Sequence, residues 1–309
     1  MIHGFLKACT VSPALRVADC AFNTQQTIAA MQRAAADGAQ LAVFPELGLT
    51  GYTCGDLFLS ALLLDAAEEA LLNICAHTQN CDPVVVLGVP LRAGGKLYNC
   101  AAVLHRGRIL GVVPKTWLPN YDVFAEKRCF ASAAAYHGPG SVPVSGADVP
   151  FGTGLVFACA QMPAFRLGVE LCEDVWAPIP PSVRLCLAGA TVIANCSASP
   201  EAAGKHAYLR QLVAQQSART IAAYVYCSAG FGESTTDLVF AGNAVIAAER
   251  CAFCIEHITV KTKVKPLGQH IFFAVRRLFA DHIGVSLYYN GRGVFIARRR
   301  RFFDYKIMR

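Results

Sequence analysis

The chain has 309 residues, of which 54% are hydrophobic and 16% are charged. This length and composition can bury one large core or two small ones, which is typical of a globular protein. No apolar run reaches the ~18 residues that a membrane-spanning helix needs. The N-terminal residues contain too short an apolar stretch for a secretory signal, so we expect no membrane segment and a reducing, cytoplasmic compartment.

The net charge of +7 is concentrated near the C-terminus, where residues 251 to 309 contain 12 Lys or Arg and 3 acidic residues. Because the rest of the chain is nearly neutral, composition does not favour a nucleic-acid partner. The 14 cysteines mostly lie singly in apolar segments, which is typical of reduced core cysteines rather than of a disulfide scaffold. Cys251 and Cys254, with His257 nearby, lack the second ligand pair usual for zinc, so we expect no metal site.

Helical and strand patterns alternate along the first 248 residues. In chain order we expect a strand at 5–11, a helix at 23–36 with Asn23 as its N-cap, a strand at 41–44, a helix at 60–78, a strand at 84–90, and a hairpin of 98–104 with 108–114. After a Gly- and Pro-rich connection at 131–150 we expect strands at 154–160, 165–171, 191–197 and 221–227, helices at 181–189 and 201–219, and a closing hairpin within 237–248. Several strands are apolar on both faces, and crossovers occur beside hairpins, which predicts mixed sheets covered by helices.

The pattern changes after residue 249, where charged and aromatic residues follow no helical or strand period. We therefore expect one domain over residues 1–249 and a divergent basic tail over residues 250–309.

Three chemically different residues each follow a predicted strand. Glu46 follows "LAVFP", Lys115 follows "GVVP" and Cys172 follows "RLGVEL". Because strand ends in parallel and mixed sheets converge on one rim, where sites are commonly built, an acid, a base and a thiol are predicted to meet there.

These three groups suit attack on an amide. A free thiol is only a few per cent thiolate at neutral pH, so it needs a proton acceptor or a cation, which Glu46 and Lys115 could supply. Lys115 and the backbone N–H following Cys172 would stabilise the oxyanion. The attack would give a thioester and release ammonia, and water activated by Glu46 would complete hydrolysis.

Other cysteine mechanisms fit the sequence less well. None of the eight histidines lies in a strand-end setting like those of Glu46, Lys115 and Cys172, which disfavours a Cys/His pair. An N-terminal nucleophile is excluded by the Met1-Ile2 start unless the chain is processed, and no G-x-C-x-G elbow surrounds Cys172.

The stretches "FPELGLTGY", "PKTWLPNYDVFAEKRCF" and "GVELCEDVW" resemble the three signature regions of the nitrilase, or carbon-nitrogen hydrolase, superfamily. Four stretches resemble most closely the N-terminal glutaminase domains of glutamine-dependent NAD synthetases. They are "LPNYDVFAEKRCF", "CEDVWAP", "NCSASP" and "GESTTDLVFAG". The resemblance covers roughly residues 3 to 248.

This resemblance implies an α+β fold, a four-layer α-β-β-α sandwich with mixed sheets. It also implies Glu46 as general base, Lys115 as oxyanion stabiliser and Cys172 as nucleophile, with Glu126 orienting Lys115 and the water. The positions that the family uses to line its glutamine pocket are Tyr52, Tyr121, Glu173, Trp176 and Ser199.

The family's S-G-G-x-D-S phosphate loop, which belongs to its synthetase domain, is not found in this sequence. The resemblance therefore implies a glutaminase step that needs no cofactor, since ATP and deamido-NAD belong to that second domain. It further implies glutamine as substrate, a synthetase domain or subunit as partner, and a homo-oligomer. Truncation, a shifted reading frame or a divergent tail would each explain the basic C-terminal region.

Our hypothesis is a glutamine amidohydrolase that supplies ammonia for NAD synthesis. Two alternatives remain open at this point. One is a free-standing amidase acting on another small amide. The other is a catalytically inactive binding protein whose tail, with "ARRRRFFDYK", contacts nucleic acid or an acidic partner.

Overall fold

The computed structural model of the chain describes residues 5–235, 237–248, 269–276, 285–290 and 293–298. The chain forms two compact units, residues 1–275 and residues 276–309. Everything that concerns the candidate site lies in the first unit.

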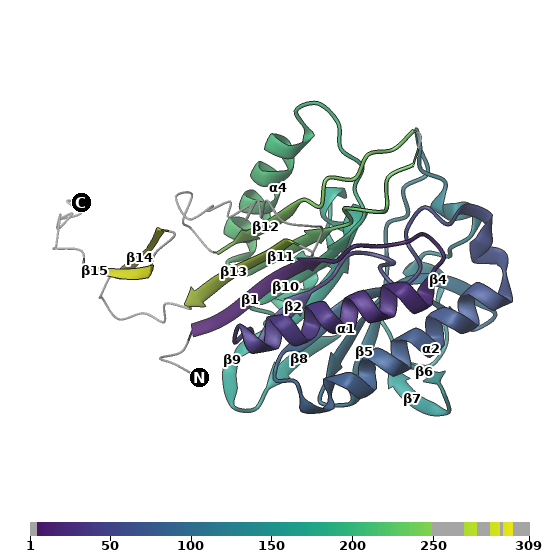
Figure 1. Cartoon of the computed structure of the whole chain (residues 1–309), viewed down its shortest axis with the longest axis horizontal. Coiled ribbons are helices and arrows are strands. Elements are labelled where there is room, and N and C mark those ends of the chain that lie inside the picture. Colours follow the sequence, from purple (N-terminus) through teal and green to yellow (C-terminus); the bar gives the residue numbers. More distant parts are fainter. Residues whose placement is uncertain (1–4, 236, 249–268, 277–284, 291–292, 299–309) are drawn as a thin grey trace, which may run out of the picture. The chain divides into compact units, whose positions relative to one another are not determined.

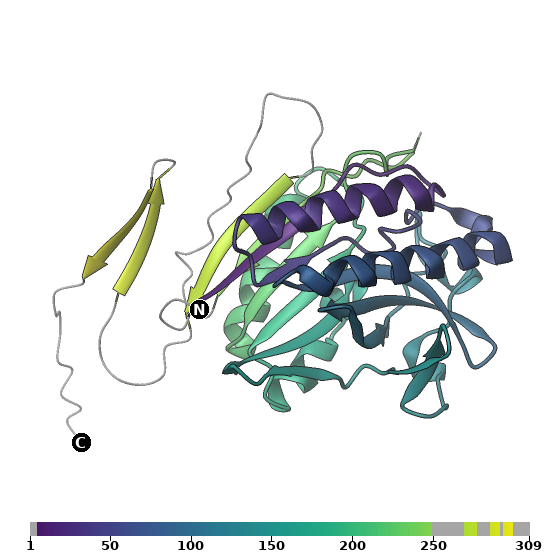
Figure 2. The ribbon, with the colours of Figure 1, turned by 60° about the horizontal axis from the view of Figure 1, so that its bottom comes forward.

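The first unit contains a six-stranded mixed sheet with the strand order β13-β1-β2-β3-β4-β5. Its strands are β1 (Phe5–Ser12), β2 (Leu41–Val43), β3 (Val84–Ala93), β4 (Lys96–His105), β5 (Arg108–Pro114) and β13 (Gln269–Arg276). Strands β1, β2 and β3 are parallel, whereas β3, β4 and β5 are antiparallel neighbours. Helices α1 (Cys20–Ala36) and α2 (Ala61–His77) lie side by side over one face of this sheet (Figures 1 and 2).

A second sheet has five strands in the order β12-β11-β10-β9-β8. Its strands are β8 (Val156–Cys159), β9 (Met162–Leu171), β10 (Val192–Ser197), β11 (Ala223–Ser228) and β12 (Ala244–Ala247). Strands β9, β10 and β11 are parallel, and β8 and β12 run antiparallel at the two edges. Helices α3 (Pro181–Leu187) and α4 (Lys205–Thr220) belong to this half of the unit.

Three apolar layers hold these elements together. The first lies between α1, α2 and the first sheet, and includes Met31, Leu71 and Leu87. The second lies between the two sheets, and the third packs α3 and α4 against the outer face of the second sheet. Strands with apolar side chains on both faces need other elements packed on both sides of the sheet, and these three layers supply that packing. The expected four-layer α-β-β-α sandwich is thereby confirmed.

The first helix begins earlier than the sequence pattern predicts. Asp19, not Asn23, is the N-cap, and its Oδ1 accepts a hydrogen bond from the N–H of Phe22 at 2.9 Å. Asn23 lies inside the helix, where its amide donates to the carbonyls of Arg16 and Leu49. An asparagine that has partners outside the helix gives the same sequence signal as a cap.

Two other predicted regions differ in the structure. The connection at 131–150 contains a small hairpin of β6 (Ser141–Val144) and β7 (Ala147–Pro150). The closing hairpin does not form, because only β12 of the 237–248 segment is a strand and it pairs with β11 instead.

Five short 3-10 helices lie in the described part of the chain, and two of them carry site residues, Glu126 in η3 and Cys172 in η5. They are η1 (Gly55–Leu59), η2 (Thr78–Asn80), η3 (Glu126–Arg128), η4 (Ala133–Ala135) and η5 (Cys172–Trp176). Each is a single turn or slightly more, so its position depends on tertiary contacts rather than on helix propensity.

The second unit contains an antiparallel hairpin of β14 (Val285–Asn290) and β15 (Gly293–Arg298). The Cys251, Cys254 and His257 group lies outside the described residues. Among the described residues, no helix combines the length and the apolar character required to cross a membrane.

Candidate active site

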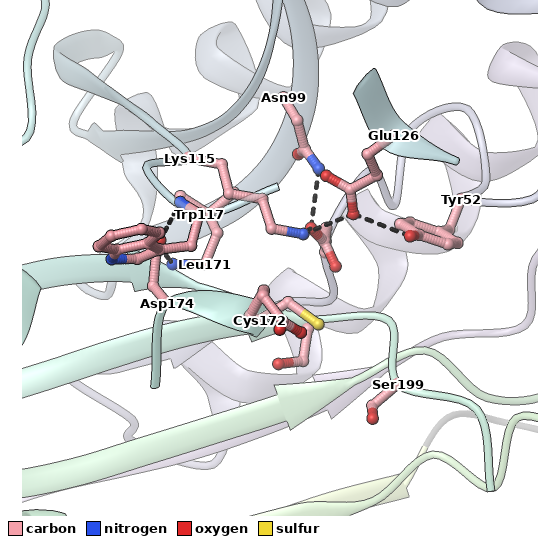
Figure 3. A network of polar contacts seen from close by, with 12 residues as sticks. Tyr52, Asn99, Lys115, Trp117, Glu126, Leu171, Cys172, Asp174 and Ser199 are labelled. Carbon is pink, nitrogen blue, oxygen red and sulfur yellow. Dashed lines mark hydrogen bonds and ion pairs between the residues drawn. The ribbon is translucent and has the colours of Figure 1, made fainter. Parts of the chain in front are cut away.

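Glu46 and Lys115 meet in the interior at the ends of β2 and β5. The Nζ atom of Lys115 lies 2.6 Å from Oε1 of Glu46 and 2.6 Å from Oε1 of Glu126, the first residue of η3. Glu46 and Lys115 are fully buried, and Glu126 is 5% exposed. One ammonium group is therefore shared by two buried carboxylates, as Figure 3 shows around Lys115 and Glu126.

Glu46 is held in place by the backbone of both sheets. Its N–H donates to the carbonyl of Ser197 at the end of β10. The chain around Glu46 passes so close to β3 that a Cβ at Gly88 would lie 2.1 Å from the backbone nitrogen of Leu47. Only glycine fits at that crossing. Asn99 of β4 adds a hydrogen bond of 2.7 Å from Nδ2 to Oε1 of Glu46.

Cys172 is the first residue of η5, directly after β9. Its backbone has φ of +39°, in the left-handed region that is costly for residues other than glycine. Its N–H donates to Oδ1 of Asn195 at 3.0 Å. Asp174 closes the turn by accepting hydrogen bonds from the N–H groups of Leu171 at 3.0 Å and Trp117 at 2.8 Å. Asp174 therefore ties the turn that carries Cys172 to the segment that follows Lys115.

The charges of the site act on one another. Burial opposes the positive charge of Lys115, but the carboxylates of Glu126 and Glu46 raise its pKa well above the usual value. Burial and the nearby Glu46 raise the pKa of the Cys172 thiol, and Lys115 only partly counters them. Burial also raises the pKa of Glu126, against the effect of Lys115. These effects favour the charged form of Lys115 and the neutral thiol form of Cys172.

Each carboxylate beside Lys115 has a second oxygen that is available for chemistry. In the described part of the chain, Oε2 of Glu46 and Oε2 of Glu126 are buried without a hydrogen-bond partner. Buried carboxylate oxygens are usually satisfied, so this pair indicates a place where a substrate or water binds. Figure 3 shows Cys172 beside the network of Lys115, Glu126 and Tyr52.

Tyr52 is the fourth member of this network. Its hydroxyl donates to Oε1 of Glu126 at 2.8 Å. The Tyr52 segment is anchored by the buried carboxylate of Glu233, which accepts from the N–H of Tyr52 at 3.0 Å and from the N–H of Thr53 at 2.8 Å. A loop more than 180 residues away in sequence therefore fixes Tyr52 and, through it, Glu126.

The other residues predicted for substrate binding lie around this network rather than within it. The Tyr121 hydroxyl, which is solvent-exposed, donates to the carboxylate of Glu173 at 2.9 Å. Burial raises the pKa of Glu173, and the hydrogen bond from Tyr121 opposes that effect. Ser199 is buried just beyond the end of β10, on the same side of the site as Cys172 (Figure 3).

Trp176 lies farther along the η5 turn and makes a different kind of contact. Its ring stacks on Tyr208 of α4 with centroids 5.5 Å apart, and the ammonium of Lys205 lies 5.8 Å from its centroid. Trp176 thus makes its ring contacts with residues of α4.

The sequence pattern did not single out four residues that the structure brings to the site, Asn99, Asp174, Asn195 and Glu233. Each is a polar side chain that is at most 1% exposed. Asn99 and Asn195 lie in otherwise apolar strands, and a buried amide within such a strand needs a partner. That is the signal from which both could have been found.

The described residues contain no group of three or more His, Cys, Asp or Glu side chains arranged to hold a metal ion. The twelve cysteines with described positions are all free thiols.

The sequence profile of the carbon-nitrogen hydrolase family matches residues 8–256. This chain belongs to that family. This carbon-nitrogen hydrolase is 46% identical over 244 residues to the glutamine-dependent NAD(+) synthetase of Mycobacterium tuberculosis (strain CDC 1551 / Oshkosh). The alignment covers 79% of this chain and 36% of the relative. It is 33% identical over 225 residues to the enzyme of the same name from Thermotoga maritima, covering 72% of this chain and 35% of the relative. The carbon-nitrogen hydrolase chain thus spans about a third of the length of these relatives.

Solved structures share this fold. A glutamine-dependent NAD(+) synthetase from Cytophaga hutchinsonii superposes with a TM-score of 0.73 at 27% identity, covering 87% of this chain and 43% of that one. An amidase from Nesterenkonia sp. superposes with a TM-score of 0.62 at 20% identity, covering 80% and 84% of the two chains, which shows the shared fold.

Proposed function

We propose that this carbon-nitrogen hydrolase is the glutamine amidohydrolase part of a glutamine-dependent NAD(+) synthetase. The observation that carries the proposal is the buried ammonium of Lys115, 2.6 Å from carboxylate oxygens of both Glu46 and Glu126, at the strand ends where Cys172 also lies. The names of its relatives support the choice of glutamine.

In the acylation step, Glu46 takes the proton of the Cys172 thiol while the sulfur attacks the carboxamide carbon of glutamine. Lys115 and the N–H after Cys172 stabilise the oxyanion that forms. Collapse of this intermediate breaks the carbon–nitrogen bond, and the proton held by Glu46 leaves with ammonia. The product on the enzyme is a glutamyl thioester.

In the second step a water molecule replaces ammonia. Glu46 takes a proton from this water as its oxygen attacks the thioester carbon, and Lys115 again faces the oxyanion. The carbon–sulfur bond then breaks, the proton returns to sulfur, and glutamate leaves. Glu126 keeps Lys115 oriented throughout, since its Oε1 bonds both Nζ and the Tyr52 hydroxyl.

Recognition of glutamine rather than of a simple amide requires groups for its charged end. Glu173 is a carboxylate next to the nucleophile in sequence, and Tyr121 holds it. A carboxylate at this position suits the α-ammonium group of an amino acid. The ammonia would be used by a synthetase domain or subunit, which is where ATP and deamido-NAD would bind. The glutaminase step itself uses no cofactor, and a homo-oligomer is the assembly we propose.

Ammonia release from glutamine by the purified chain tests this proposal. We expect Cys172→Ala to abolish release while leaving the fold intact. A panel of small amides separates the glutaminase from a free-standing amidase, because faster turnover of any simple amide than of glutamine would favour the amidase. A wild-type chain that hydrolyses no amide would favour the binding-protein alternative.

A further inference from the structure

The backbone of Cys172 is held from behind by a buried asparagine. Oδ1 of Asn195 on β10 accepts from the N–H of Cys172 at 3.0 Å and from the hydroxyl of Ser197 at 2.7 Å. Cys172 has φ of +39°, a conformation that a non-glycine residue keeps only where its surroundings enforce it. Among the described residues, Asn195 is the side chain that accepts a hydrogen bond from the N–H of Cys172.

Asn195 is itself the end of a chain of hydrogen bonds. Its Nδ2 donates to the hydroxyl of Tyr224 on β11 at 3.0 Å, and that hydroxyl donates to Oε1 of Glu170 on β9. The other oxygen of Glu170 accepts from the N–H of Ser182 at 2.7 Å. Asn195, Tyr224 and Glu170 are all 0% exposed. The sheet register sets this arrangement, because Asn195 lies directly opposite Glu170 on the neighbouring strand.

The hydrogen bonds can run in one direction only. The N–H of Cys172 is a donor, so the oxygen of Asn195 must face it and the amide NH₂ must face Tyr224. The Tyr224 hydroxyl then accepts that bond and has one proton left, which goes to Glu170. Glu170 accepts at both oxygens, from Tyr224 and from the N–H of Ser182. Burial raises its pKa, and the bonds from Tyr224 and Ser182 oppose that effect.

We propose that Glu170, Tyr224 and Asn195 form a directional hydrogen-bond relay that positions Cys172 for attack. The relay residues are positioning residues, because they act through the backbone of Cys172 and not on the substrate. Part of this inference rests on the proposed function, since the reaction that Cys172 performs is taken from it. The relay also explains why an asparagine occupies an otherwise apolar strand.

Two variants test the relay with little change of shape. Tyr224→Phe removes one hydroxyl and leaves the ring in place. Glu170→Gln keeps the shape but supplies one oxygen and one NH₂ group to a site that offers two donors, so it reverses or breaks the relay. For each variant we expect kcat for glutamine to fall at least tenfold with KM within threefold of wild type. Unchanged kcat in both variants would overturn the proposal.

A matched control separates positioning from simple loss of stability. Val213 on α4 is fully buried in the same apolar layer as Tyr224 but belongs to no part of the relay. Val213→Ala should lower Tm while kcat of the folded protein stays within twofold of wild type. If Val213→Ala reduces kcat as much as Tyr224→Phe at a similar loss of Tm, the relay is only structural and the proposal fails.

A double-mutant cycle tests whether Tyr224 acts through Asn195. If the two belong to one relay, Tyr224→Phe combined with Asn195→Leu should lower kcat no further than the more damaging single variant. Losses that multiply would show that the two residues act independently, which would contradict a relay.

A substrate-free measurement keeps the relay testable even if the protein does not hydrolyse glutamine. The rate at which iodoacetamide alkylates Cys172, followed by peptide mass spectrometry, reports how the thiol is held beside Lys115. We expect this rate to fall at least fivefold in Tyr224→Phe and Glu170→Gln and to stay unchanged in Val213→Ala. An inactive wild type with these altered rates would reject the proposed function and keep the relay. Equal rates in all four proteins, together with unchanged kcat where wild type is active, would reject the relay.

Discussion

Lys115 and Glu126 form an ion pair in the protein interior, with Nζ and Oε1 2.6 Å apart and the lysine fully buried. Glu46 approaches the same ammonium to the same distance. A charge this deeply buried is tolerated because it is paired, and here it is paired twice. The positive charge that the proposed oxyanion needs is therefore in place before the substrate arrives.

Replacing Lys115 by methionine should damage both chemistry and stability. The substitution leaves the carboxylates of Glu46 and Glu126 side by side without their cation, which should cost about 3–5 kcal/mol of unfolding free energy. It also removes an oxyanion donor, which should lower kcat by ~10²- to 10³-fold or more. Chemical denaturation and glutamine turnover measure the two effects. A variant with more than a tenth of wild-type kcat would contradict the role given to Lys115.

The pH dependence of thiol reactivity should reveal a neutral cysteine. Burial and Glu46 raise the pKa of Cys172, so its thiolate fraction should keep rising with pH beyond the value near 8.5 where an ordinary thiol is half ionised. Without substrate, alkylation of Cys172 by iodoacetamide should therefore still accelerate above pH 9. The Cys172→Ala variant gives the background from the other thiols. A rate that is already level below pH 7 would indicate a preformed thiolate pair instead.

The anchoring of Tyr52 by Glu233 can be separated from the hydroxyl that Tyr52 supplies. Glu233→Gln places an NH₂ group against an N–H donor of the 52–53 backbone, so we expect a loss of about 1–3 kcal/mol of stability and a lower kcat. Tyr52→Phe removes only the bond to Glu126, and should lower kcat with little change in stability. Thermal unfolding and steady-state kinetics check the pair of variants. Equal stability losses in both would show that the anchor does not act as described.

Glu173 should determine which amide the enzyme prefers. If its carboxylate binds the α-ammonium of glutamine, Glu173→Gln should raise KM for glutamine at least tenfold and leave hydrolysis of propionamide, which has no ammonium, nearly unchanged. Tyr121→Phe, which releases the carboxylate, should shift KM in the same direction by less. Equal effects on the two substrates would assign Glu173 a structural role.

The sequence predicts the placement of the central residues because the end of an apolar strand is a local signal. Glu46 and Lys115 follow such strands after a proline, Cys172 follows one directly, and the structure brings the first two into direct contact. Strands that are apolar on both faces predict mixed sheets covered by helices, and the resemblance to the carbon-nitrogen hydrolase superfamily implies the four-layer sandwich. The inferences from the residues alone need only neighbouring residues and the rule that strand ends share a rim.

The supporting residues could not be predicted in the same way, because their partners are set by tertiary register. Asn195 reaches Cys172 only because β10 pairs with β9 in one particular register. Glu233 and Tyr52 come together from loops that are far apart in the chain. Likewise, Asn23 has the signature of a helix cap but bonds to two carbonyls outside its helix, and Asp19 caps the helix instead. Local patterns do not contain this information.

Mass spectrometry of the acid-quenched enzyme during glutamine turnover tests the central claim most directly. We predict a covalent adduct with the mass of glutamine minus ammonia, located on the peptide that contains Cys172 and absent from Cys172→Ala. Ammonia release by Cys172→Ala at the wild-type rate, or an adduct on another cysteine, would contradict the assignment of Cys172 as the nucleophile.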